Sequence, residues 1–92
     1  MIPPHQIATI RELTAKFQPT QLGVFGSYAR GEATQESDLD ILIEFGQKVN
    51  FLELVELEQS LSDALGIKVD LVTLRSVNPR LKPYILKDLV ML

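Results

Sequence analysis

Residues 38–74 contain two apolar, strand-like runs separated by one long amphipathic segment. DLDILIEF (38–45) has the alternation of a strand, and IKVDLVTL (67–74) is predicted as another. Between them FLELVELEQSLSDALG (51–66) has the apolar spacing of an amphipathic helix, and Gly66 stands where helices commonly end. A strand, a crossover helix and a second strand nearly always form a right-handed unit with parallel strands. This segment therefore predicts a parallel pair of strands with one helix packed on them.

The segments on either side of this unit predict the remaining elements. A helix-compatible pattern begins at Pro3–Pro4, and QLGVFG (21–26) is typical of a short buried strand. SYARGEA (27–33) permits a short helix. LKPYILKDLVML (81–92) predicts a final helix with Pro83 near its start, because an interior proline would break it. The predicted fold class is α/β (α+β), a small mixed three-stranded sheet flanked by helices in the order α-β-α-β-α-β-α.

Apolar periodicity predicts which faces of these elements are buried. The first helix carries one apolar stripe, made of Ile7, Ile10, Leu13, Thr14 and Phe17. The helix 51–66 has a predicted core face made of Phe51, Leu54, Val55, Leu57, Leu61, Ala64 and Leu65. Alternation in strand 38–45 places on one face Asp38, Asp40, Leu42 and Glu44, and on the other Leu39, Ile41, Ile43 and Phe45. The terminal YILKDLVML (84–92) is apolar on more than one side, so it is either core or a stripe that a partner covers.

Composition narrows the class of function. The chain has 92 residues, which predicts one small domain spanning 1–92, and a net charge of −3. An acidic chain lacks the basic surface by which proteins hold nucleic acid directly; a metal–nucleotide complex or a basic partner protein suits it better. The absence of cysteine excludes disulfides and thiolate metal sites. The first residues do not have the pattern of a secretory signal, and no apolar run approaches the roughly 20 residues that span a bilayer. We therefore expect a cytoplasmic protein without membrane contact.

Three carboxylates lie near the predicted starts of two neighbouring strands. Asp38 and Asp40 begin strand 38–45, and Asp70 lies near the start of strand 67–74. Parallel neighbours place their N-terminal ends together, so Asp70 can approach the other two on one face. Carboxylates this close repel one another unless a cation joins them, and Mg²⁺ takes such oxygen ligands. The pattern predicts a metal site, and a pair of Mg²⁺ ions could hold the attacking and leaving oxygens of a phosphoryl displacement.

The end of strand 21–26 supplies groups that suit phosphate. Gly26 allows a phosphate to approach the main chain closely, and Ser27 offers a hydroxyl and a backbone N–H. If this strand pairs antiparallel with strand 38–45, both residues reach the edge that holds the aspartates. Arg30 either neutralises phosphate charge or forms an ion pair with a neighbouring carboxylate. The predicted ligand is a nucleoside triphosphate with its metal ions.

The spacing of these residues resembles a known family signature. GSYARGEATQESDLDILIEF (26–45) is similar to the Gly-Ser-x10-Asp-x-Asp signature of the DNA polymerase β-type nucleotidyltransferase superfamily. The residues of this stretch and the short length of the chain resemble those of the minimal nucleotidyltransferases of prokaryotes. VDLVT (69–73) and NPRLKPYILKD (78–88) also resemble later parts of that group. The resemblance covers most of the chain and implies a mixed sheet flanked by helices.

The resemblance also implies a role for each matched residue. Asp38 and Asp40 would bind the metals, and Asp70 would complete the site and help to activate the acceptor hydroxyl. Gly26 and Ser27 would hold the triphosphate. All five positions match the family pattern, so we expect an active enzyme.

The same resemblance implies a partner. Minimal nucleotidyltransferases typically act as antitoxins of helical HEPN-domain toxins, and some transfer AMP from ATP to a tyrosine hydroxyl. We therefore expect a Mg²⁺-dependent nucleotidyltransferase that moves AMP from ATP to a hydroxyl of such a toxin. Larger nucleotidyltransferases close a second domain over the substrate, a place that a partner in an oligomer could fill here. Two alternatives remain open: a binding antitoxin that blocks the toxin by contact alone, and an enzyme that modifies a small molecule such as an aminoglycoside.

Overall fold

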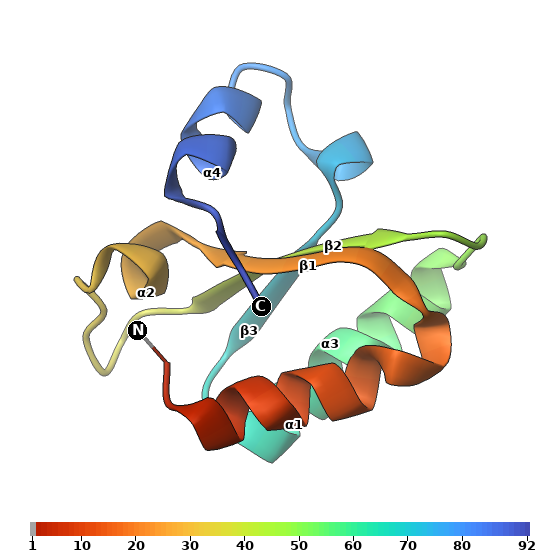
Figure 1. Ribbon diagram of the computed structural model, residues 1–92, viewed down its shortest axis with the longest axis horizontal. Helices are drawn as coiled ribbons and strands as arrows, with labels where there is room; N and C mark the ends of the chain where they lie inside the picture. The colour runs from red at the N-terminus through yellow and green to blue at the C-terminus, as the bar shows by residue number, and fades with distance from the viewer. Residues whose placement is uncertain (1) are drawn as a thin grey trace.

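A computed structural model describes residues 2–92 and shows a mixed sheet with helices on both faces (Figure 1). The sheet has four strands in the order β3-β2-β1-β4, namely β1 (Pro19–Phe25), β2 (Leu39–Phe45), β3 (Val69–Val72) and β4 (Val90–Met91). The helices are α1 (Pro4–Thr14), α2 (Gly26–Arg30), α3 (Phe51–Leu65) and α4 (Lys82–Asp88), with 3₁₀ turns η1 (Ala15–Phe17) and η2 (Leu74–Ser76). In Figure 1, α1 and α3 lie together below the sheet and α4 stands above it. The α/β class is confirmed, whereas the predicted count of three strands is wrong, because β4 adds a fourth.

The pairing of β1, β2 and β3 agrees with the prediction from sequence. β2 and β3 are parallel, with Leu39 opposite Val69 and Asp40 opposite Asp70, and α3 forms the crossover between them. β1 runs antiparallel to β2, with Phe25 opposite Asp40. The end of β1 and the starts of β2 and β3 therefore meet at one edge of the sheet.

The core lies between the sheet and the layer of α1 and α3. Its buried apolar side chains include Ile10, Phe17, Val24, Leu39, Ile41, Ile43, Leu57 and Leu61. The stripe predicted for the first helix is confirmed, whereas the predicted core face of α3 is partly wrong. Phe51 is 78% exposed and Val55 42% exposed, and Ala64 is also exposed. Successive residues turn by about 100° around a helix, and these three lie at the borders of a stripe that is narrower than the apolar pattern suggested.

The predicted C-terminal helix over 81–92 is wrong in its last residues. α4 ends at Asp88, and β4 then pairs antiparallel with β1, placing Val90 opposite Val24 and Met91 opposite Gly23. Gly23 permits this return of the chain: a Cβ there would lie 2.6 Å from Leu89 Cδ1 and 3.0 Å from the Val90 carbonyl oxygen. β4 forms because it pairs with Gly23, which is distant in sequence, and such pairing has no periodic pattern within residues 81–92. The apolar pattern of these residues therefore predicted a helix throughout.

Gly23→Ala is expected to destabilise the protein by about 1–3 kcal/mol, because the added methyl group forces Leu89 and the β4 backbone away from β1. The free energy of unfolding in urea measures the effect. Gly46→Ala is the matched control: its Cβ would meet the exposed Thr20 side chain at 3.1 Å, where a small rotation relieves the contact. Equal stabilities of the two variants would contradict close packing of β4 on Gly23.

Candidate active site

The predicted site residues meet at one end of the sheet. Phe25, Asp40 and Asp70 form a row across three adjacent strands, since Asp40 is in register with both of the others. Neighbouring strands lie about 4.8 Å apart, so the side chains of Asp40 and Asp70 leave the sheet side by side on the same face. Gly26 and Ser27 follow Phe25 directly. The fold thus brings the Gly-Ser pair and the aspartates of two strands to one edge.

Side-chain acceptors fix the position of β3 beside β2. The backbone N–H groups on either side of Asp70 donate to Ser62 Oγ at 3.0 Å and to Glu58 Oε2 at 2.8 Å. These bonds from α3 satisfy the outer edge of β3, which would otherwise lack partners. Glu44, on the aspartate face of β2, accepts from the Leu74 N–H at 2.6 Å. Glu44 therefore has a structural contact and stands apart from the candidate ligands.

Gly26 has a backbone conformation and a close contact that both exclude a side chain. Its φ is +74°, in the left-handed region that favours glycine, and a Cβ built there would collide with Asp40 Oδ2. The missing side chain therefore makes room for a carboxylate of the site itself, a reason that the sequence did not reveal. No described side chain caps the start of α2, so the first N–H groups of this short helix, with that of Ser27, can face an anion.

Asp40 is half-buried and surrounded by other charges. Burial raises the pKa of the Asp40 carboxyl above its ordinary value of 3.8, and the charges of Asp70 and Asp38 raise that pKa further, while the charge of Arg30 acts in the opposite direction. Asp38 lies immediately before β2, with a carboxylate oxygen 3.8 Å from Lys68 Nζ. The fields of Asp38 and Asp70 thus both reach Asp40, which is the centre of the acidic group.

This donor set fits a hard divalent cation. Carboxylate oxygens are ligands that Mg²⁺ prefers, and the repulsion at Asp40 is what a bound cation would relieve. Within residues 2–92, no three His, Cys, Asp or Glu side chains are close enough together to form a ready-made metal-binding group. Asp38 leans toward Lys68, and Asp70 is exposed. Binding a cation would therefore require one or both of these side chains to turn toward Asp40.

A cleft of about 420 Å³ opens beside this edge. The start of α2 and the side chain of Asp70 line one side, and the segment from η2 to α4 lines the other with mostly apolar groups. Such a volume suits a small-molecule ligand. Inspection of the sequence missed the α4 side, although Leu81, Ile85 and Asp88 recur at four- and three-residue spacing and so share one helix face.

Arg30 lines this cleft and has two carboxylate partners. Its Nη1 donates to Asp88 Oδ2 at 2.6 Å, and its Nε donates to Glu32 Oε2 at 3.1 Å. The predicted ion-pair alternative for Arg30 is therefore confirmed. Arg30 and Gly26 both line the cleft, so contact between Arg30 and a phosphate stays a prediction.

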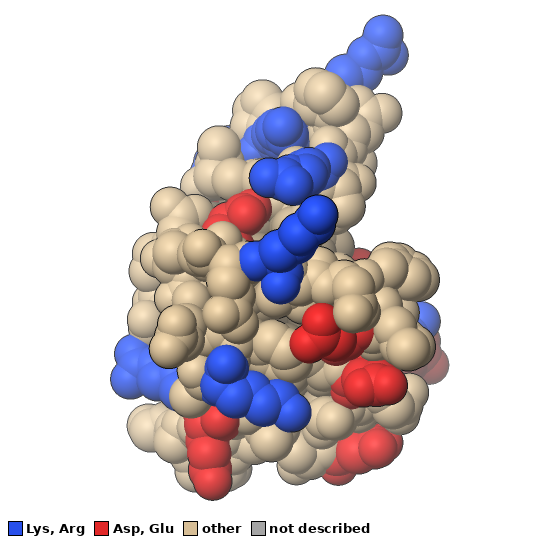
Figure 2. Space-filling view, turned by 90° about the vertical axis from the view of Figure 1, so that its right-hand side faces the viewer, with Lys and Arg blue, Asp and Glu red and all other residues tan. Residues whose placement is uncertain are grey.

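Charge is unevenly distributed over the molecule. The only acidic residue of segment 74–92 is Asp88, while its basic residues are Arg75, Arg80, Lys82 and Lys87. In α3 the charged residues are all acidic: Glu53, Glu56, Glu58 and Asp63. Figure 2 shows Lys and Arg gathered in the upper part of one face, at the level of α4, and most Asp and Glu below. These four basic residues belong to the segment that bounds the cleft, but the basic residue that lines the cleft itself is Arg30. No helix in residues 2–92 is long and apolar enough to cross a bilayer.

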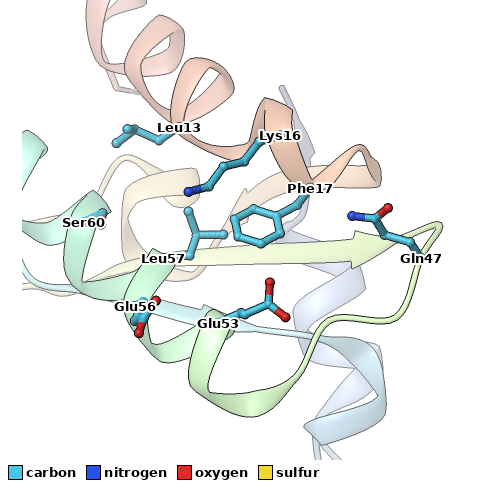
Figure 3. Close-up of a pocket in the computed structure, with 8 residues that line it drawn as sticks. All are labelled: Leu13, Lys16, Phe17, Gln47, Glu53, Glu56, Leu57 and Ser60. Atoms are coloured by element: carbon cyan, nitrogen blue, oxygen red, sulfur yellow. The ribbon is translucent and has the colours of Figure 1, made fainter.

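A second hollow, of about 360 Å³, lies between the end of α1 and α3. In Figure 3, Lys16 and Phe17 project from one side and Glu53 and Leu57 from the other. None of the aspartates or the Gly-Ser pair lines it. The hollow therefore lacks the residues predicted to bind metal and phosphate, and the cleft beside α2 remains the candidate active site.

Comparison with known proteins identifies the family. The sequence model described as "Nucleotidyltransferase domain" matches residues 7–92, a range that contains every site residue discussed above. The chain belongs to this nucleotidyltransferase family. A candidate protein adenylyltransferase of Methanocaldococcus jannaschii, MJ0126, is 48% identical over 81 residues, which cover 87% of this chain and 83% of the relative. The protein adenylyltransferase MntA of Thermococcus cleftensis is 41% identical over 80 residues, covering 87% of this chain and 81% of MntA.

Solved structures share the fold of this nucleotidyltransferase. The crystal structure of a toxin–antitoxin with AMP-PNP contains a chain that matches with a TM-score of 0.81 at 27% identity, covering 98% of this chain and 72% of that one. A structure of the tri-AMPylated Shewanella oneidensis HEPN toxin with its MNT antitoxin matches with a TM-score of 0.66 at 28% identity, covering 95% and 66%. The predicted minimal nucleotidyltransferase fold is confirmed.

Proposed function

We propose that this nucleotidyltransferase is a Mg²⁺-dependent protein adenylyltransferase that moves AMP from ATP to a tyrosine hydroxyl of a HEPN-type toxin and so acts as its antitoxin. The observation that carries the proposal is the meeting of Gly26–Ser27 with Asp40 and Asp70 at one sheet edge, beside a cleft that Arg30 also lines. The names of the relatives supply the acceptor class, since they include protein adenylyltransferases and toxin–antitoxin assemblies. We also propose that the protein acts in the cytoplasm and that residues 1–92 form one catalytic domain.

The carboxylates are the proposed metal ligands. Asp38, Asp40 and Asp70 would hold two Mg²⁺ ions, which when bound neutralise the triphosphate and polarise the phosphate that is attacked. Asp40 is the central ligand, because it is in register with Asp70 and its pKa responds to both other aspartates.

The main chain at the start of α2 is the proposed triphosphate site. The N–H groups at Gly26 and Ser27 would donate to phosphate oxygens, and the Ser27 hydroxyl would add a further donor. Arg30, one helical turn away on the same side of the cleft, would neutralise the charge of the leaving pyrophosphate.

The proposed reaction is a displacement at the α-phosphorus of ATP. The acceptor oxygen forms a bond to that phosphorus, while the bond from the phosphorus to the oxygen of pyrophosphate breaks. The proton of the acceptor hydroxyl passes to the Asp70 carboxylate, which is exposed at the cleft and therefore reachable by a side chain of another protein. Pyrophosphate leaves from the Gly26–Ser27 side.

Transfer of label from ATP tests this function. The protein is incubated with Mg²⁺, a HEPN-domain toxin, and ATP labelled on either the α- or the γ-phosphate. We expect the toxin to gain label from α-labelled ATP and none from γ-labelled ATP, and to lose its toxic activity. Loss of toxicity without label would favour a binding antitoxin. Label on a small hydroxyl compound and none on protein would favour the small-molecule alternative.

A further inference from the structure

We propose that Asp88 is a positioning residue for nucleotide binding, because it holds the Arg30 guanidinium in the orientation that a triphosphate requires. The inference rests on the proposed function, since it concerns the same ATP site. Neither the family signature nor the predicted metal site includes Asp88, which lies 58 residues from Arg30 in the sequence.

The contact joins the two sides of the cleft. Arg30 is the last residue of α2 and Asp88 the last residue of α4, and both line the cleft. Their 2.6 Å contact is shorter than the 3.1 Å contact between Arg30 and Glu32. The Asp88 side chain is 21% exposed and that of Glu32 65% exposed, so solvent screens the pair with Asp88 less. Asp88 is therefore the partner that fixes the guanidinium.

The orientation of the guanidinium leaves donors for a ligand. Glu32 takes the Nε–H and Asp88 takes an N–H of Nη1, and neither contact uses Nη2. Because Asp88 holds one terminal nitrogen of the planar guanidinium, the N–H groups of Nη2 have a fixed direction. Arg30 and Gly26 line the same cleft, and Gly26 lies directly against the Asp40 carboxylate, so the guanidinium faces the cleft that contains the predicted reacting end.

The sign of the charge on Asp88 makes this role testable. A carboxylate at the rim of a site for triphosphate opposes binding by repulsion. Asp88 is also the single acidic residue of segment 74–92 and pairs with a distant arginine although basic residues lie nearby in sequence. If Asp88 acted by charge alone, its removal would strengthen ATP binding. If it positions Arg30, its removal weakens ATP binding.

Isothermal titration of ATP with Mg²⁺ into the 92-residue protein separates these outcomes. We expect Asp88→Asn to raise the Kd for ATP about tenfold, because the phosphate contact of Arg30 is no longer held. In the transfer assay kcat/KM for ATP should fall by at least a similar factor, and kcat should fall as well, because Arg30 also neutralises the leaving pyrophosphate. Unchanged or tighter binding by Asp88→Asn would overturn the inference.

Three further variants distinguish two roles of Asp88: positioning of the Arg30 guanidinium, and an ion pair that only connects α2 to α4. Glu32→Gln removes the other carboxylate partner, which does not line the cleft, and should change the Kd by less than about twofold. Asp88→Glu keeps the charge and moves it by one methylene, so an intermediate Kd is expected. The double variant Arg30→Asp with Asp88→Arg restores an ion pair between α2 and α4 and should still bind ATP weakly. Recovery of wild-type affinity in that double variant would show that the ion pair alone matters and would overturn the positioning role.

The wild-type titration separates this inference from the proposed function. If the wild-type protein does not bind ATP in the presence of Mg²⁺, both proposals are wrong. If it binds ATP and transfers AMP while Asp88→Asn does so with equal affinity, only the role of Asp88 is wrong.

Discussion

Asp40→Asn is expected to abolish AMP transfer and at the same time to raise the melting temperature measured without divalent cations. Loss of the central metal ligand removes several kcal/mol of transition-state stabilisation, which corresponds to a rate loss of roughly 10³-fold or more. The same change removes a charge that is half-buried and repelled by Asp70 and Asp38. A gain in stability that accompanies a loss of activity is what a site built from repelling carboxylates predicts.

The pH dependence of this stability follows from the direction of the pKa shift. The folded protein holds a proton on Asp40 more tightly than the unfolded chain does, since the pKa of Asp40 is raised above 3.8. The free energy of unfolding therefore includes a contribution from the proton bound to Asp40. This contribution is fully present below pH 3.8 and is lost as the pH rises through the pKa of Asp40 in the folded protein. Wild type and Asp40→Asn should therefore melt alike in acid, and the variant should melt higher at neutral pH.

Melting curves with and without Mg²⁺ check both parts of this expectation. Mg²⁺ should raise the melting temperature of wild type and have little effect on Asp40→Asn. Glu12→Gln, an exposed carboxylate change on α1, is the control and should respond to Mg²⁺ as wild type does. A variant at position 40 that neutralises the toxin as well as wild type, with no AMP transferred, would instead support the binding antitoxin.

Gly26→Ala is expected to cost at least about 100-fold in AMP transfer, while Gly31→Ala leaves transfer within a few-fold of wild type. Both glycines have a φ of +74°, so an alanine at either position brings the same left-handed backbone strain, of about 1–2 kcal/mol. They differ in their surroundings: a Cβ at residue 26 collides with the Asp40 carboxylate, whereas a Cβ at residue 31 meets nothing within 4 Å. Comparing the two variants therefore isolates the contact with Asp40.

The urea midpoints and transfer rates of the two glycine variants are measured together. Gly26→Ala should lose about 1–3 kcal/mol more stability than Gly31→Ala, because Asp40 or the start of α2 must move. Comparable activity in both variants would mean that the fit of Gly26 against Asp40 has no part in catalysis.

The arrangement of the site could be predicted from sequence because local rules determine it. The crossover helix 51–66 makes the strands on either side parallel, which brings Asp40 and Asp70 together at one edge. A Gly-Ser pair at the end of an adjacent antiparallel strand then reaches the same edge. Each step needs only a periodicity, a connection length and one rule of strand direction.

The features that the sequence did not reveal depend on contacts between distant segments. β4 packs closely against Gly23 of β1, and the cleft forms between the start of α2 and α4. The pair of Arg30 and Asp88 is of the same kind. The narrower core face of α3 has another cause, since Phe51 and Val55 are apolar residues that packing leaves in solvent. Periodicity finds apolar faces but does not say how much of each face a neighbour covers.

A crystal structure of the protein with Mg²⁺ and a non-hydrolysable ATP analogue tests the central claim most directly. We predict density for metal ions in contact with Asp40 and with Asp38 or Asp70, and for phosphates against the Gly26 and Ser27 main chain. The base should lie in the cleft beneath α4. Nucleotide bound elsewhere, for example in the hollow between α1 and α3, with no metal at Asp40, would contradict the account.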